Sequence, residues 1–414
     1  MKGLKGALMF AQSGGPTSVI NASAAGVFIE GLNSEMITEV YGAAHGIRGI
    51  LNEEFYDISK EDIKELELLK YTPSSALGSV RYKLKDASVD DTDYKRLLEV
   101  FKKYNVRYFF YNGGNDSMDT CNKISKYMAK SGYEINVIGV PKTIDNDLYG
   151  TDHCPGFASA AKYIATSIME INLDAKVYDT PMICVIEVMG RNAGWLTAAA
   201  KLANLKGLGA DLIYLPEIAF DVNKFVADVK SVMAKNNNKC IAVVSEGIKN
   251  ADGVLVCEAL GQAGARDSFG HAQLGGVAAT LSNIIKAETG SKVRAIELSL
   301  MQRCAAHCAS ATDIEETFGA GKEAVKAAVN GETDKMICYA RKEGDKYECE
   351  YKLLPLELAA NTEKTVPLEW ITDNGTNISD EFIAYALPLI QGETELPKED
   401  GLPRFARLKK VLVK

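Results

Sequence analysis

The segment PKTIDND, residues 141–147, holds a lysine, a threonine and two aspartates directly after an apolar run. In an extended chain alternate side chains point to the same side, which would bring Thr143, Asp145 and Asp147 together. Two carboxylates beside Lys142 could supply a general base and a counter-charge in one place. A solvated acidic turn is the alternative. It is the weaker interpretation, because the preceding run INVIGV predicts a buried strand.

Two further segments combine glycines with groups that could hold phosphate or a metal ion. SGGPTS, residues 13–18, places Gly15 ahead of an expected helix, whose first backbone N–H groups could bind a phosphate. GGNDS, residues 113–117, places Asn115 and Asp116 at another expected helix start, where oxygen ligands would suit Mg²⁺. Each segment alone fits an ordinary strand–helix turn at least as well, and Asp116 could simply complement the helix dipole.

The elements that must position these residues alternate along the chain. Short apolar runs predict strands, and the amphipathic or small-residue stretches between them predict helices. The main expected strands cover residues 6–11, 106–112, 135–140, 181–190 and 240–247. This alternation predicts βαβ units, and therefore an α/β fold whose mostly parallel sheet is covered by helices on both faces. From about Lys335 the pattern changes and predicts an antiparallel β-hairpin.

The polar, glycine-rich segments share one position in this pattern. SGGPTS, GGNDS, PKTIDND, MGRN and SEG each follow a predicted strand. In open α/β sheets ligands bind outside the carboxyl ends of the strands. We therefore expect these segments to build one shared site.

Length and composition limit the class of protein. A chain of 414 residues is expected to form two domains. Its net charge of −8 argues against a nucleic-acid or membrane partner, so an anionic substrate would need a local basic cluster. No stretch approaches the ~20 apolar residues of a membrane span, and the N-terminus does not resemble a signal peptide. Nine cysteines without a C-x-x-C pair predict reduced thiols in the cytoplasm.

One cysteine cluster raises the question of a metal site. Helical spacing could bring Cys304, His307 and Cys308 to one face. Zinc would require a fourth ligand, and the neighbouring sequence offers none. Buried thiols beside a histidine are therefore the preferred interpretation.

Eight segments of the chain, taken together and in their order, resemble the motifs of the phosphofructokinase family. They are SGGPTSVIN, LGSVRYK, GGNDS, PKTIDND, GTDHCPGF, EVMGRNAGWL, VVSEG and MQR. The resemblance covers about residues 5–340. It implies two Rossmann-like domains with mostly parallel sheets, plus a C-terminal extension with the hairpin. The expected division is 1–155 with 304–355 for the phosphate donor and Mg²⁺, and 156–303 with 356–414 for the sugar phosphate. It also implies phosphoryl transfer to the C1 hydroxyl of fructose 6-phosphate, a reaction of glycolysis.

The resemblance assigns a role to each matching residue. Asp145 corresponds to the general base, and Thr143 and Asp147 to the neighbours that orient substrate and base. Arg191 corresponds to the residue that stabilises charge on the transferred phosphoryl group. The remaining matches are Gly15, Arg81 and Lys83 on the donor side, Met189, Gly190, Glu246, Arg294 and Arg303 around the sugar phosphate, and Asn115 and Asp116 at Mg²⁺.

Asp116 and Lys142 bear on the choice of phosphoryl donor. They stand where ATP-using members of the family have glycines, in GGDGS and PGTIDND. A carboxylate there would fill the space of the nucleotide's α-phosphate and repel it; two like charges ~4 Å apart cost about 4 kcal/mol at an effective dielectric of 20. Lys142 instead offers a positive charge to a compact anion. The pair resembles the pyrophosphate-dependent branch, which implies pyrophosphate as donor, Mg²⁺ as cofactor and a homodimer or homotetramer.

Departures from the family pattern leave alternatives open. Asn115 stands where the family usually has a magnesium-binding aspartate, which is the sole support for a non-catalytic regulatory subunit. Met182 and Leu300 stand where many members of the family have an arginine and a histidine that bind the sugar phosphate. We therefore expect other residues to bind the 6-phosphate, for example Lys or Tyr residues of the extension. Asp116 and Lys142 oppose an ATP-dependent 6-phosphofructokinase. No G-x-G-x-x-G follows a strand, which opposes a dehydrogenase. Sedoheptulose 7-phosphate stays open as a substrate.

Overall fold

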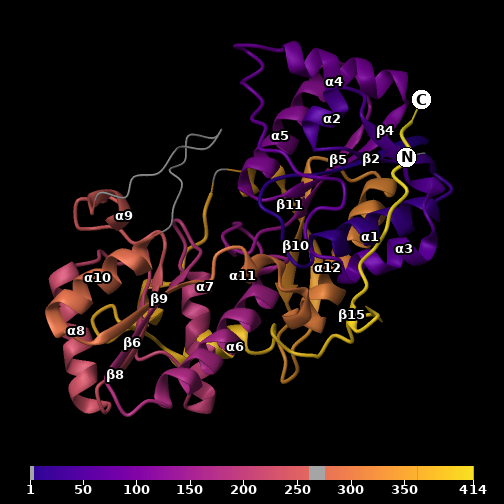
Figure 1. The fold of residues 1–414 in the computed structure, drawn as a ribbon. Helices are drawn as coiled ribbons and strands as arrows, with labels where there is room; N and C mark the ends of the chain where they lie inside the picture. Colours follow the sequence, from indigo (N-terminus) through magenta and orange to yellow (C-terminus); the bar gives the residue numbers. More distant parts are fainter. Residues whose placement is uncertain (1–3, 261–275, 361, 414) are drawn as a thin grey trace.

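The computed structural model describes residues 4–260, 276–360 and 362–413, which form two lobes, each built around a β-sheet (Figure 1). The larger sheet has seven strands in the order β11-β10-β5-β4-β1-β2-β3. Neighbours from β10 to β2 run parallel, and the edge strands β3 and β11 pair antiparallel. The strands are β1 (Gly6–Gln12), β2 (Ile37–Ala43), β3 (Phe55–Asp57), β4 (Val106–Gly113), β5 (Asn136–Pro141), β10 (Lys335–Arg341) and β11 (Cys349–Pro355).

Strand β1 shows how this sheet is covered on both faces. It is buried along its whole length, and its alternate side chains belong to two different apolar clusters. Ala7, Met9 and Ala11 lie with α4 (Thr92–Lys103) and α5 (Asn115–Lys130), whereas Leu8 and Phe10 lie with α1 (Ile20–Leu32) and α12 (Ala311–Val329). A parallel sheet buried on both faces is what successive βαβ units produce.

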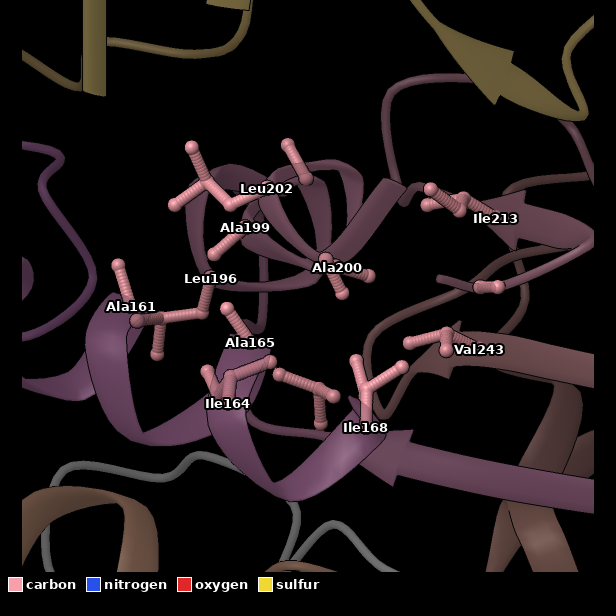
Figure 2. Packing of buried hydrophobic residues seen from close by; sticks show 14 of the residues in the cluster. Ala161, Ile164, Ala165, Ile168, Leu196, Ala199, Ala200, Leu202, Ile213 and Val243 are labelled. Atoms are coloured by element: carbon pink, nitrogen blue, oxygen red, sulfur yellow. The ribbon is translucent and has the colours of Figure 1, made fainter. Parts of the chain in front are cut away.

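The smaller sheet has four parallel strands in the order β7-β8-β6-β9. They are β6 (Met182–Val188), β7 (Leu212–Tyr214), β8 (Lys239–Ser245) and β9 (Lys292–Glu297). Figure 2 shows the core on one face, where Ile164 and Ile168 of α6 (Phe157–Lys176) share a cluster with Leu196 and Val243. Because these side chains are completely buried, the cluster holds α6 and the segment after β6 in place.

The other described helices are 4 to 14 residues long. They are α2 (Ile47–Leu51), α3 (Ile63–Leu68), α7 (Trp195–Ala198), α8 (Val222–Lys235), α9 (Val256–Ala259), α10 (Val277–Thr289), α11 (Met301–Cys304), α13 (Leu356–Ala359) and α14 (Asp380–Ala386). The 3₁₀ turns are η1 (Ile58–Lys60), η2 (Leu69–Tyr71), η3 (Ala199–Lys206), η4 (Ala306–Cys308) and η5 (Leu368–Trp370).

The C-terminal extension contacts both lobes. It carries two short hairpins, formed by β12 (Ile371–Thr372) with β13 (Asn377–Ile378) and by β14 (Lys398–Glu399) with β15 (Leu402–Pro403). Its end returns to the larger sheet, where Asp57 N–H donates to Val411 O and Val413 N–H donates to Phe55 O, both at 2.9 Å. The last described residues of the extension therefore lie beside the edge strand β3 of the larger sheet.

The predicted α/β class, the mostly parallel sheets and the hairpin after Lys335 are confirmed. Strand β9 was not predicted, because residues 292–297 form a largely exposed edge strand without a continuous apolar run. Among the described residues, no helix is long and apolar enough to span a membrane. The domain boundaries given above stay a prediction.

Candidate active site

A cavity of about 600 Å³ lies where the carboxyl ends of several strands meet. The segments after β1, β4, β5 and β6 line it, and Arg81 and one residue of the C-terminal extension join them. The segment SEG after β8, the fifth one expected at the shared site, is not part of the lining. The predicted residues at its wall are Gly15, Arg81, Asn115, Asp116, Lys142, Thr143, Asp145, Asp147 and Arg191. Ser13, Gly14, Gly114, Ser117, Asn192, Ala193 and Glu363 complete it.

The loop after β5, residues 142–152, carries the two candidate carboxylates, and we call it the catalytic loop. The extended backbone expected for it is wrong: Asn146 has φ +56°, so the chain turns between Asp145 and Asp147. Thr143, Asp145 and Asp147 nevertheless all reach the cavity. Thr143 Oγ1 donates to Asp145 Oδ2 at 3.3 Å and accepts from Asp145 N–H at 3.2 Å, which orients that carboxylate.

The unusual backbone at Asn146 is stabilised by its own side chain. Asn146 is completely buried; its Nδ2 donates to Tyr385 Oη at 2.8 Å, and its Oδ1 accepts from Cys154 N–H at 2.8 Å. Asparagine tolerates the left-handed region better than most residues. The turn between the two carboxylates is thus held from the C-terminal extension, where Tyr385 lies in α14.

Burial controls the electrostatics of the catalytic loop. It raises the pKa of Asp145, against the opposing effects of Lys142, Thr143 and Arg191. It also raises the pKa of Asp147 to about 7, with a further contribution from the Asp145 charge. Burial lowers the pKa of Lys142 to about 8, although both aspartates oppose this. A carboxylate with a raised pKa is a stronger base, as proton abstraction near neutral pH requires.

The loop after β6 brings Arg191 to the cavity wall. Gly190 has φ +141°, where a side chain would be strained, and a Cβ there would lie 2.7 Å from Ala193 O. Gly190 N–H donates to Glu246 Oε1 at 3.2 Å, and Met189 N–H donates to Gln302 Oε1 at 3.1 Å. Burial raises the pKa of Glu246 to about 7. Met189 and Gly190 thus belong to the Arg191 loop, Glu246 is hydrogen-bonded to it, and none of the three is part of the cavity lining.

The donor side is built by the turn after β1. Gly14 has φ +77°, and a Cβ at that position would lie 3.2 Å from Lys142 Nζ. A Cβ at Gly15 would lie 3.1 Å from Arg303 Nη1, which places the Arg303 guanidinium beside this turn. Burial and the nearby charge of Arg81 both lower the pKa of Arg303. Three cationic side chains, Lys142, Arg81 and Arg303, thus gather here, which gives the local basic cluster that an anionic substrate needs.

The predicted metal residues open α5, and we tested whether they suit Mg²⁺. Asn115 Nδ2 donates to Asp147 Oδ2 at 3.2 Å, which leaves Asn115 Oδ1 as a buried oxygen without a hydrogen-bond partner among the described residues. The exposed Asp116 carboxylate follows it at the cavity wall. An unpartnered oxygen beside carboxylates matches the oxygen ligands that Mg²⁺ takes, few of which need come from protein. The group fits.

Two further predicted residues, Lys83 and Arg294, are not part of the cavity lining. Lys83 is exposed and is not part of the lining. Arg294 lies within the edge strand β9, exposed and paired with Cys184 of β6. Of the two departures, Met182 is the first residue of β6 and is buried, and Leu300 is 54% exposed. The roles assigned to Lys83 and Arg294 stay predictions.

The cysteine cluster gives no sign of a ligand set. Cys304 and Cys308 are half-buried, and His307 is exposed. Cys308 Sγ lies 3.8 Å from Thr166 Oγ1. Within the described ranges, no three His, Cys, Asp or Glu side chains group as they would to hold a metal ion.

Comparison with known proteins identifies the family to which this site belongs. Residues 7–328 match the family model described as phosphofructokinase. The chain belongs to the phosphofructokinase family. Pyrophosphate–fructose 6-phosphate 1-phosphotransferase of Halomonas elongata is 44% identical over 406 residues, which cover 97% of this chain and 96% of that protein. The protein of the same name from Xanthomonas campestris is 46% identical over 415 residues, covering 99% and 97%.

A solved phosphofructokinase shows the same fold. The crystal structure of the pyrophosphate-dependent phosphofructokinase from Marinobacter aquaeolei matches with a TM-score of 0.88 and 41% identity, covering 99% of this chain and 98% of that one. The similarity therefore includes the C-terminal extension, beyond the 7–328 range of the family model.

Of the lining residues to which the sequence assigned no role, six lie within the motifs SGGPTS, GGNDS and EVMGRNAGWL, and Glu363 lies outside all of them. Asn192 follows Arg191 directly and could have been included by position alone. Glu363 lies in the extension, outside every recognised motif, and reaches the cavity only through the tertiary fold. No local signal in the sequence indicates it.

Proposed function

We propose that this protein transfers a phosphoryl group from pyrophosphate to the C1 hydroxyl of fructose 6-phosphate, giving fructose 1,6-bisphosphate and phosphate in a reversible reaction of glycolysis and gluconeogenesis. The observation that carries the proposal is the pairing of Asp116 and Lys142 in one cavity with Asp145 and Arg191. The names of the relatives at 44% and 46% identity support the same donor.

Asp145 accepts the proton of the C1 hydroxyl in this mechanism. The sugar oxygen then forms a bond to one phosphorus of pyrophosphate, and the bridging P–O bond breaks to release phosphate. Thr143 orients the Asp145 carboxylate through their hydrogen bond. Arg191 stabilises the charge of the transferred group, and Lys142 that of the departing phosphate. Most of the rate enhancement in phosphoryl transfer comes from such alignment and charge stabilisation.

Mg²⁺ is the proposed cofactor. Asn115 Oδ1 and the carboxylates of Asp116 and Asp147 would hold it, and it would neutralise charge on the pyrophosphate oxygens. The hydrogen bond from Asn115 Nδ2 to Asp147 Oδ2 directs the amide oxygen away from that carboxylate, so that Asn115 can act as an oxygen ligand. The site therefore does not need the aspartate common in the family at this position, which removes the support for a non-catalytic subunit.

The preference for pyrophosphate over ATP follows from two side chains on the donor side. Lys142 N–H donates to Gly113 O at 2.9 Å, so the catalytic loop and the turn that carries Asp116 are tied together. Asp116 adds bulk and negative charge at the cavity wall, where a nucleotide would extend beyond its β- and γ-phosphates. Lys142 places an ammonium beside Gly14, where a compact anion can reach it.

Several parts of the proposal extend to the protein as a whole. The enzyme is a cytoplasmic homodimer or homotetramer without nucleic-acid or membrane partners. All nine cysteines lie in described parts of the chain as free thiols, which suits a reducing compartment. Sedoheptulose 7-phosphate is a second candidate acceptor, because nothing in the cavity specifies the length of the sugar.

One assay tests the proposed function. Purified protein is incubated with fructose 6-phosphate, Mg²⁺ and either pyrophosphate or ATP, and fructose 1,6-bisphosphate is measured. We expect turnover with pyrophosphate, loss of turnover with a chelator, and the reverse reaction from fructose 1,6-bisphosphate and phosphate. Turnover with ATP alone would favour the ATP-dependent enzyme, and no turnover with either donor would favour the regulatory subunit.

A further inference from the structure

A segment of the C-terminal extension, residues 362–366, contacts the two loops that carry the proposed base and the proposed charge stabiliser; we call it the crossing segment. On one side it pairs with the catalytic loop. Leu148 and Glu363 form an isolated antiparallel bridge, and Lys364 N–H donates to Asp147 O at 2.8 Å. The segment is thus joined by backbone contacts to the residue next to Asn146 in the turn.

Lys364 strengthens this attachment. Its Nζ donates to Thr151 O at 3.1 Å and to Asp152 O at 2.7 Å, at the far end of the catalytic loop. Burial lowers the pKa of Lys364. Charge-assisted hydrogen bonds to backbone carbonyls are among the stronger ones in proteins, so the crossing segment fixes the catalytic loop at its middle and at its far end.

On its other side the crossing segment is joined to the loop after Arg191. Trp195 Nε1 donates to Lys364 O at 2.9 Å, and Lys364 Nζ lies 5.1 Å from the centre of the Trp195 ring. Glu217 Oε1 accepts from Gly194 N–H at 2.8 Å and from Val366 N–H at 3.0 Å, so one carboxylate oxygen binds the backbone of the Arg191 loop and of the crossing segment. The end of the Arg191 loop is therefore tied to the crossing segment.

Glu363 completes the connection at the cavity wall. Its Oε1 accepts from Asn192 Nδ2 at 3.2 Å, and Asn192 is the neighbour of Arg191. Asn192 Oδ1 accepts in turn from Lys249 Nζ at 3.3 Å. Asp116, Asp145 and Asp147 line the same cavity, and each has a proposed role of its own. The hydrogen bond between Glu363 and Asn192 points to a different role for Glu363, because it holds the residue next to Arg191, the proposed charge stabiliser.

We propose that Glu363 is a positioning residue, which through Asn192 fixes the Arg191 loop relative to Asp145. The C-terminal extension would thereby contribute to catalysis. The proposal rests on the proposed function for the roles of Asp145 and Arg191. A misplacement of about 1 Å can lower an enzymatic rate ~10²-fold. Because Glu363 acts through a single side-chain contact, its loss should have a smaller effect.

The test uses variants that separate the hydrogen bond from the charge. Glu363→Ala removes both, whereas Glu363→Gln keeps an oxygen that can accept from Asn192. Glu369→Ala, at an exposed glutamate of the same extension, is the control. We expect Glu363→Ala to lower kcat about tenfold, with the KM for each substrate changed less than about twofold. Glu363→Gln should regain most of that kcat, and Glu369→Ala should match the unaltered enzyme.

A double variant adds a readout that general destabilisation would not produce. Asn192→Ala should lower kcat as Glu363→Ala does, and the double variant should lose no more than either single one, because both remove the same contact. Full kcat in Glu363→Ala, an equal loss in Glu363→Gln, or additive losses in the double variant would overturn the proposal.

Hydrogen exchange separates this proposal from the proposed function. In substrate-free protein, the peptide 189–195 should exchange faster in Glu363→Ala than in Glu363→Gln or Glu369→Ala. Equal exchange in all three would overturn the positioning role. If the unaltered protein turned over neither donor, the proposed function would fail, and the exchange comparison would still decide whether Glu363 holds the Arg191 loop.

Discussion

The catalytic loop and the donor side line one cavity but are held in different ways. Lys142, Thr143 and Asn146 are buried, and the loop is tied down by Tyr385 and Lys364 of the extension. On the donor side, by contrast, Arg81 and Asp116 are exposed. Burial therefore sets the base strength in the catalytic loop, whereas the donor is selected by the size and charge of the exposed Asp116 together with the ammonium of Lys142, which the loop supplies. Substitutions in the catalytic loop should therefore lower the rate and the stability, whereas substitutions on the donor side should change the donor preference.

Asp145→Asn should have the largest effect on the buried side. The amide keeps the size of the carboxylate but cannot accept the C1 proton, so kcat should fall by roughly 10²–10⁴-fold, the usual contribution of general-base catalysis. Substrate binding should be largely retained. Steady-state kinetics with pyrophosphate and fructose 6-phosphate measure both, and a variant within a few-fold of the unaltered enzyme would rule out Asp145 as the base.

Tyr385→Phe tests whether the extension stabilises the turn in the catalytic loop. The Tyr385 hydroxyl accepts from Asn146 Nδ2 and donates to Asp152 O, both at 2.8 Å. Its removal leaves the buried Asn146 Nδ2 without this acceptor, whereas Asp152 O keeps its hydrogen bond from Lys364 Nζ. The free energy of unfolding should therefore fall by about 1–3 kcal/mol. Denaturant unfolding measures the loss.

The control for this variant lies in the same loop. Tyr149 is 48% exposed, so Tyr149→Phe should leave the free energy of unfolding nearly unchanged. Equal stability of the two variants would show that Tyr385 does not hold the turn.

Asp147→Asn should reveal the energetic consequence of burying two carboxylates together. The pKa of Asp147 is raised to about 7 in the folded chain, above the ordinary value of about 3.9. The folded state therefore binds its proton more tightly than the unfolded state does, and the unaltered protein loses stability as the pH rises between these values. Asparagine carries no charge, so the variant avoids that loss.

Melting temperatures across pH test this sign. Asp147→Asn should melt a few degrees above the unaltered protein at pH 8, and the difference should vanish near pH 4. Asp179→Asn, at an exposed aspartate, is the control. A variant less stable than the unaltered protein at pH 8 would contradict the account of burial on this side.

The positions of the motifs could be predicted from the sequence because each follows an apolar strand of a parallel sheet. That rule brought Gly15, Asn115, Asp145 and Arg191 to one cavity without knowledge of their distances. The backbone conformation within a motif was harder to predict from the sequence. Alternation suggested an extended chain through PKTIDND, but the buried side chain of Asn146 finds its partners only when the backbone turns there.

Long-range contacts could not be predicted from the sequence, for a different reason. Glu363 has no motif around it, and its place at the cavity depends on a backbone bridge to Leu148 and on the packing of Lys364 against Trp195. Strand β9 was missed because an exposed edge strand such as KVRAIE need not alternate or be apolar. Both features are set by tertiary structure, which local patterns do not report.

The central claim joins the two sides, because the exposed Asp116 and the buried Lys142 together select pyrophosphate. Its most direct test is the ratio of kcat/KM for pyrophosphate to kcat/KM for ATP, in the unaltered enzyme, in Asp116→Gly and in the double variant with Lys142→Gly. Circular dichroism checks that each variant is folded.

We expect the unaltered enzyme to use pyrophosphate, and Asp116→Gly alone to allow detectable turnover with ATP. The added Lys142→Gly should weaken the use of pyrophosphate by about 2–3 kcal/mol, as the loss of a charge-assisted hydrogen bond would, and move the ratio further toward ATP. An unaltered enzyme that prefers ATP, or a folded double variant that gains no turnover with ATP, would contradict the claim that these two side chains choose the donor.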